Sequence, residues 1–148
     1  MPTVVQKTIV PGHYTEVMSR FDIDLFEALK PPVGKMVVEE FTGSETGDRV
    51  VLRFESPIKA RWVSDIIEHG SDERSAWFVD MGTTLPWPLT YWHHRHEVNR
   101  FSEEQSEIVD RMTFRVGLGA LDVLLWPMVY LAFYPRKAAY RRYFSGEE

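Results

Sequence analysis

Six consecutive segments between residues 36 and 116 show the two-residue periodicity of β-strands, and short turn-forming stretches separate them. The segments are rich in Val, Ile, Phe, Trp and Tyr, which favour strands, whereas the stretches between them contain Gly, Ser and Asp. Strands joined in this way pair with their chain neighbours in an antiparallel sheet. The predicted strands are 36–42, 49–55, 59–69, 74–81, 91–101 and 108–116.

A further strand and two short helices are predicted before this meander. Residues 3–10 are dense in β-branched side chains and end at Pro11-Gly12, which is typical of a strand followed by a turn. Residues 13–29 have apolar side chains at three- and four-residue steps, which predicts helix in two pieces. Pro31-Pro32-Val33-Gly34 then ends the helical section.

After the meander the periodicity becomes helical, from about residue 119 to residue 144. Pro127 and Pro135 are expected to kink this helix or divide it. The face predicted to pack onto the sheet comprises Leu121, Leu124, Leu125, Met128, Leu131 and Ala132. The predicted fold class is α+β: a curved antiparallel sheet of six to seven strands around a long C-terminal helix. The space between sheet and helix is filled by side chains or open to a ligand.

Composition limits the classes of function. The 148 residues suit one domain, residues 1–148, and 14% are aromatic. A formal net charge of −5 argues against a nucleic-acid partner. The chain has no Cys, which excludes disulfides, thiolate metal sites and a thiol nucleophile. Residues 1–10 lack the pattern of a secretory signal, so a cytoplasmic location is expected.

The apolar stretch from Val116 to Tyr134 has the length of a membrane span, but Asp122, two glycines and Pro127 interrupt it. We therefore expect a helix lying on the sheet. Transient membrane contact, through the Pro-rich loop around Trp87 and the basic residues after residue 135, is an alternative.

The strand predicted over residues 91–101 contains the most informative polar residues. Side chains alternate across a strand, so one face carries Trp92, His94, His96 and Val98. The other face is more polar, which places the first face toward the helix. In the following strand one face carries Ile108, Asp110, Met112, Phe114 and Val116. Pairing of the two strands would bring Asp110 close to His94 or His96.

Several interpretations of this cluster are open. Two imidazoles and a carboxylate can act as general acid and base, can hydrogen-bond the polar end of a ligand, or can form a buried structural network. The histidines could also hold zinc with an acidic third ligand, but the remaining histidines lie elsewhere, and no metal or cofactor is predicted.

Other residues stand out singly. Asp80 shares the face of Ala76 and Phe78, and it could be a buried functional carboxylate, a turn residue or the partner of an Arg. The same alternatives apply to Asp65 and Asp122. Trp62 is a candidate for the cavity wall, and Trp87, between two prolines, suits a cavity rim, a partner contact or a loop packed on the sheet.

Several sequence motifs, in this order along the chain, resemble the START-like or Bet v 1-like (SRPBCC) superfamily. The chain is most similar to bacterial ligand-binding members of the polyketide cyclase/dehydratase type. The motifs are Pro31-Pro32-Val33-Gly34, Trp62–Ile66, Phe78–Asp80, Leu85–Leu89, Trp92–His96, Asp110–Phe114 and Tyr134–Arg136. The extra Pro-Trp-Pro in the Leu85–Leu89 loop and the two prolines of the last helix depart from the family pattern, so the ligand's identity cannot be carried over.

The resemblance implies a helix-grip fold with a cavity for an apolar or aromatic small molecule, such as a lipid, a quinone or a polyketide-like compound. A cyclase/dehydratase-like enzyme that uses His94, His96 and Asp110 as acid–base groups is the first alternative. A lipid or quinone carrier that visits membranes is the second. The residues expected to contact the ligand are Trp62, Trp92, His94, His96, Asp110, Met112, Phe114, Leu121, Leu125 and Met128.

Overall fold

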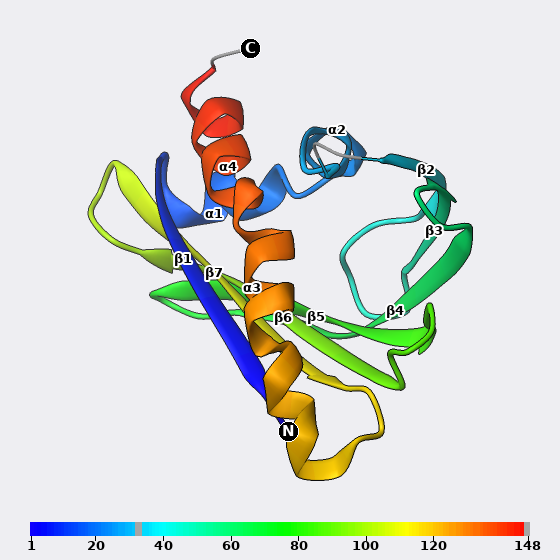
Figure 1. The fold of residues 1–148 in the computed structure, drawn as a ribbon. Helices are drawn as coiled ribbons and strands as arrows, with labels where there is room; N and C mark the ends of the chain where they lie inside the picture. Colours follow the sequence, from blue (N-terminus) through cyan, green and yellow to red (C-terminus); the bar gives the residue numbers. More distant parts are fainter. Residues whose placement is uncertain (32–33, 147–148) are drawn as a thin grey trace.

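A computed structural model describes residues 1–31 and 34–146, in which a seven-stranded antiparallel sheet is packed against helices (Figure 1). The strands are β1 (Thr3–Pro11), β2 (Lys35–Phe41), β3 (Arg49–Ser56), β4 (Ala60–Ser71), β5 (Ser75–Thr84), β6 (Tyr91–Arg100) and β7 (Gln105–Arg115). The helices are α1 (Tyr14–Ser19), α2 (Ile23–Ala28), α3 (Trp126–Phe133), α4 (Pro135–Ser145) and the 3₁₀-helix η1 (Gly119–Leu125). The predicted helix-grip architecture is confirmed. Pro32 and Val33 of the proline motif lie outside the described residues.

The order of strands in the sheet is β1-β7-β6-β5-β4-β3-β2. The six strands of the meander are therefore neighbours in chain order, and β1 adds to the free edge of β7, with Thr3 opposite Thr113. Alternate residues of β1 are buried, as the β-branched pattern predicts. Helix α4 packs across β1 and covers this end of the sheet (Figure 1).

The sheet bends strongly at β4. The pairing of β4 with β5 shifts register between Val63 and Ser64 and again between Ile66 and Glu68. Such bulges bend a strand and increase its twist. Strands β2 and β3 consequently curl out of the plane of β5–β7, on the side where α2 and α3 lie (Figure 1).

The predicted long helix is three shorter segments. Pro127 lies in the first turn of α3 and Pro135 begins α4, so the prolines divide the helix as expected. The first segment, η1, is a 3₁₀-helix rather than an α-helix. The buried carboxylate of Asp122 accepts hydrogen bonds from the backbone amides of Val116 and Leu118, at 3.2 and 2.8 Å, and anchors η1 to the end of β7.

The predicted packing face of this segment is wrong in most positions, although Leu125 packs against the core and Leu131 and Ala132 line the cavity described below. Leu121, Leu124, Met128 and Leu131 are between 57% and 69% exposed, and Leu125 is half-buried. The side chains packed against the core beneath this segment are Leu125, Trp126, Val129, Tyr130 and Phe133. A 3₁₀-helix has three residues per turn, whereas an α-helix has 3.6. Because η1 precedes α3, the side chains of α3 that face the sheet differ from those that a continuous α-helix would direct there.

The core has two parts. One lies between α1, α2, α4 and the middle of the sheet, around Val98, Ile108 and Tyr140. The other lies under α3 and contains Val4, Trp92, Met112 and Phe114. Within the described residues, no helix combines the length and hydropathy of a membrane span.

Candidate functional site

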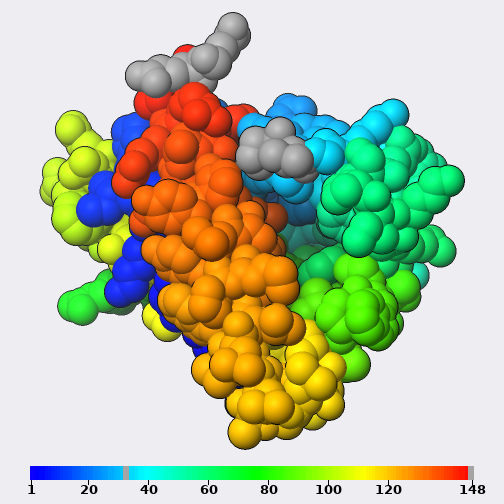
Figure 2. Space-filling model, viewed as in Figure 1, coloured from blue at the N-terminus to red at the C-terminus, as the bar shows by residue number. Residues whose placement is uncertain are grey.

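A cavity of about 530 Å³ is lined by residues from both parts of the core. Helix α2, the curled strands β2–β4 and the α3–α4 segment surround it, and Figure 2 shows the molecule hollowed between the orange-red helix and the cyan strands. Its walls are mostly apolar and include Leu25, Leu52, Ile66, Trp92 and Phe133. The volume lies within the range of about 300–1,000 Å³ typical of small-molecule sites.

A polar cluster occupies the part of the cavity wall formed by β5 and β6. His94 and His96 come from β6 and Asp80 from β5, and all three line the cavity. The register places His94 opposite Asp80, and it places His96 opposite Asp110 of β7. Both histidines of β6 and Asp110 of β7 are buried, as the alternation of faces in each strand predicts. The predicted proximity of Asp110 to the histidines is therefore confirmed.

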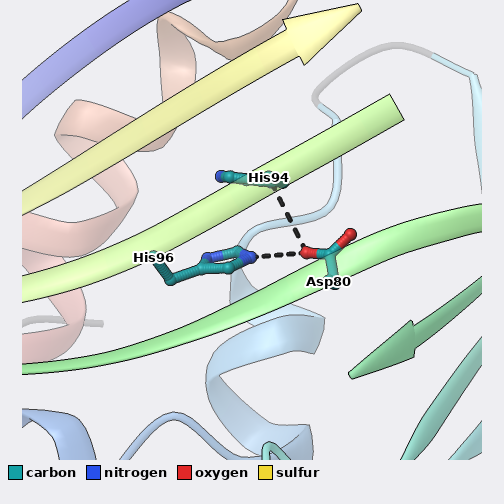
Figure 3. A group of neighbouring side chains, drawn as sticks. All are labelled: Asp80, His94 and His96. Carbon is teal, nitrogen blue, oxygen red and sulfur yellow. Dashed lines mark hydrogen bonds and ion pairs between the residues drawn. The ribbon is translucent and has the colours of Figure 1, made fainter. Parts of the chain in front are cut away.

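The two imidazole rings stack, with centroids 3.7 Å apart, and two carboxylates flank the stack. On the cavity side, Asp80 Oδ2 lies 2.6 Å from His96 Nε2 and 3.7 Å from His94 Nδ1 (Figure 3). On the far side, Asp110 Oδ1 lies 2.8 Å from His94 Nε2 and 3.5 Å from His96 Nδ1. Each ring thus directs one nitrogen to Asp80 and the other to Asp110.

The hydrogen bonds are less complete than these distances suggest. His94 Nε2 bonds to Asp110, and His96 Nε2 bonds to Asp80. Within the described part of the chain, His96 Nδ1 is a buried nitrogen with no hydrogen-bond partner. Such unpaired groups are uncommon inside proteins and call for a physical reason.

Burial sets the charge of His94. It lowers the pKa of this imidazole to about 4, helped by the neighbouring His96, although Asp80 and Asp110 favour the charged form. The attraction of the two carboxylates is therefore smaller than the cost of burying a charged ring. The buried His94 ring has lost its hydration, and the stacked ring of His96 adds a second imidazole beside it, so both oppose a positive charge on His94. His94 is accordingly neutral at pH 7 and donates Nε2–H to Asp110.

The two carboxylates are ionised. Burial opposes the charge of Asp80, but its hydrogen bond with His96 and the two imidazoles lower its pKa below the ordinary value. Burial likewise opposes the charge of Asp110, yet the His94 hydrogen bond, the two imidazoles and Arg136 together lower its pKa to about 2. Tyr140 adds a long hydrogen bond of 3.4 Å to Asp110.

Four of the residues predicted to contact a ligand line the cavity: Trp62, Trp92, His94 and His96. The ring of Trp62 meets that of Trp92 edge-on, with centroids 5.0 Å apart. Its Nε1–H donates to Ser64 Oγ at 2.9 Å, so a hydroxyl is held at the cavity wall beside the polar cluster.

Six other predicted contact residues do not line the described cavity: Asp110, Met112, Phe114, Leu121, Leu125 and Met128. Asp110 lies behind the imidazoles, and Met112 and Phe114 are fully buried in the core beneath α3. Leu121 and Met128 point to solvent because of the helix phase described above.

The residue that sequence reasoning undervalued is Asp80. Its position on the face of Ala76 and Phe78 indicated an inward side chain, but the sequence did not show that β5 pairs it with His94. By contrast, Asp65 forms a surface ion pair with Arg49 at 2.8 Å. Trp87 is 94% exposed and is not packed on the sheet.

Comparison with solved structures supports one fold family. A START superfamily protein from Mycobacterium smegmatis superposes with a TM-score of 0.73 at 8% identity, covering 97% of both chains. The chain has the START-like fold. A Thalictrum norcoclaurine synthase matches this chain with a TM-score of 0.65 at 12% identity, over 98% of this chain and 94% of the synthase. A Streptomyces aromatase/cyclase gives 0.63 at 13% identity, over 93% and 87%.

At such low sequence identity, these structural matches establish the fold alone. The chemistry has to be argued from the residues of the site. No protein-family model and no curated protein matches the sequence. The fold that the sequence resemblance implies is therefore confirmed by the structural matches.

Proposed function

We propose that this START-like chain binds an apolar or aromatic small molecule in the cavity between β2–β6, α2 and the α3–α4 segment. The observation that carries the proposal is a cavity of about 530 Å³ whose walls are mostly apolar, with one polar cluster on β5–β6 and the charged residues Arg136 and Arg142 on the α4 side. Apolar walls supply affinity at about 25 cal/mol per Å² of ligand surface buried. Lipids, quinones and polyketide-like compounds have the required apolar bodies.

The polar cluster favours a particular kind of ligand head group. Asp80 presents an ionised carboxylate to the cavity, and His94, neutral with its proton on Nε2, presents a bare Nδ1. Both are hydrogen-bond acceptors. A ligand that carries a hydroxyl, above all a phenolic hydroxyl, can donate to them, and Ser64 offers a further polar contact at the cavity wall.

The experiment pairs two adjacent isoleucines that face opposite ways on β4. Ile66 is buried and lines the cavity, whereas Ile67 is 47% exposed. The native protein should bind the uncharged dye N-phenylnaphthylamine with enhanced fluorescence. Ile66→Trp fills part of the cavity and should weaken dye binding at least about tenfold, which corresponds to about 1.4 kcal/mol.

Ile67→Trp is the matched control and should bind the dye like the native protein. No dye binding by the native protein, or equal binding by the two variants, would contradict the proposal. If the dye results support the cavity, native mass spectrometry of freshly purified protein would identify the natural ligand by its mass.

An enzymatic role is the second candidate. It is favoured by the hydrogen bond between His96 and Asp80 at the cavity wall, an arrangement suited to moving a proton to and from a bound carbonyl compound. Asp110 would then position His94 rather than contact the substrate. Turnover of a carbonyl substrate that His96→Ala abolishes would favour the enzyme, and tight binding without turnover would favour the binding protein.

A further inference from the structure

Three side chains at the cavity wall present metal-ligating atoms to a common point. Asp80, His94 and His96 each contribute one such atom, and these atoms lie within 4.8 Å of one another. They come from the middle of two paired strands, β5 and β6, so the sheet fixes their spacing. The set combines two imidazoles with one carboxylate (Figure 3), and all three residues line the cavity.

The spacing of the donor atoms suits a metal ion. With bonds of about 2.1 Å, two ligands on one ion lie about 3.0–3.4 Å apart, depending on the angle between them. Asp80 Oδ2 is 2.6 Å from His96 Nε2 and 3.7 Å from His94 Nδ1. These distances lie on either side of the required range, and all three donor atoms lie within 4.8 Å of one another, so an ion is admitted once the side chains shift and the stacked rings tilt toward it.

The second nitrogen of each ring supports the same conclusion. Metal-binding histidines usually donate their other N–H to a carboxylate, which fixes the tautomer. His94 already does so, because Nε2 bonds to Asp110 at 2.8 Å and leaves Nδ1 free to bind. Asp110 is buried and also lies 3.5 Å from His96 Nδ1, so one carboxylate backs both rings.

A bound metal would also pair the orphaned nitrogen. Without an ion, His96 carries its proton on Nε2, toward Asp80, and Nδ1 has no partner among the described residues. With an ion on Nε2, the same proton resides on Nδ1 and faces Asp110. No proton is gained or lost, and every nitrogen of both rings then has a partner.

We propose that Asp80, His94 and His96 form a site for a divalent transition metal, with Zn²⁺ as the test ion, and that its open coordination positions face the cavity. Asp110 is buried and the Asp80 side chain is only 14% exposed, so both provide negative charge close to the site that a cation would help to balance. The sequence pattern identifies no particular residue as the acidic third ligand and predicts no metal, whereas the structure places Asp80 in front of the rings and Asp110 behind them. The site goes beyond ligand binding and does not require it.

The test measures metal directly. Chelator-treated protein, dialysed against Zn²⁺, should retain one ion per chain, and Co²⁺ should give the visible absorption of a low-symmetry site. Asp80→Asn and His96→Gln should each lose stoichiometric Zn²⁺. Asp110→Asn keeps the three ligands but disturbs their support, so it should weaken Zn²⁺ binding by about 10–100-fold.

His93→Gln is the matched control, because His93 lies on the opposite face of β6 and should leave Zn²⁺ binding unchanged. Nitrogen chemical shifts of the native protein provide a test that needs no variant. Addition of Zn²⁺ should change the chemical shifts of His94 Nδ1 and His96 Nε2. Absence of Zn²⁺ binding, or binding unaffected by His96→Gln, would overturn the proposal. Dye binding by the metal-free protein tests the proposed function separately.

Discussion

Acid should destabilise the metal-free protein through His94. This side chain is 3% exposed, and its ring lies between Trp92 and the stacked ring of His96. The charged groups that face it are Asp80 and Asp110. Burial dominates over their attraction, so the folded state takes up a proton on this ring at a lower pH than the unfolded chain.

The magnitude follows from the displaced titration. The pKa of His94 falls from 6.5 to about 4 on folding. Between these pH values the unfolded chain binds more protons than the folded chain, so the free energy of unfolding rises with pH across this window. The loss begins near pH 6.5 and is complete near pH 4, and it amounts to roughly 3 kcal/mol. Asp110, with its pKa near 2, adds a separate loss at still lower pH.

Urea unfolding of the metal-free protein between about pH 7 and about pH 4.5 measures this effect. His94→Gln keeps a donor for Asp110 but cannot titrate, so most of the loss across this window should disappear. His93→Gln should retain it. An NMR titration of native His94 with a midpoint above 6.5, or equal pH dependence in the native protein and His94→Gln, would refute the reasoning.

Two further predictions concern the packing around the cavity, and urea unfolding at neutral pH checks both. Asp122→Ala removes the acceptor of the Val116 and Leu118 amides and should cost about 1–3 kcal/mol; a cost below about 0.5 kcal/mol would show that η1 is anchored otherwise. Trp92→Ala should cost about 3–5 kcal/mol because its ring joins the sheet to α3. Leu124→Ala, on the exposed side of η1, is the control for both and should change stability by less than about 0.5 kcal/mol.

The strands and the inward face of β6 could be predicted because strand periodicity is local. Each side chain alternates faces regardless of distant contacts, so the burial of Trp92, His94 and His96 followed from parity alone. Turn residues marked where strands end, and the meander then fixed which strands pair. The closeness of Asp110 to the histidines followed from the same reasoning.

The helix face and the role of Asp80 depended on information that the sequence pattern lacks. The residues of α3 are apolar on nearly every side, so periodicity could not identify its buried face once η1 had changed the helical phase. Asp80 needed the register between β5 and β6, which follows from the turn geometry at residues 85–90 rather than from alternation.

The position of β1 has a consequence for how the protein folds. Its partner strand is β7, and Thr3 hydrogen-bonds to Thr113 across 110 residues of chain. Emerging from the ribosome, β1 therefore has no strand to pair with until β7 has been made, and its neighbour α4 is made later still. Contacts so distant in sequence slow folding, because the intervening loop must close before they form. We expect the β2–β7 meander to form first and β1 to join it late, together with α4.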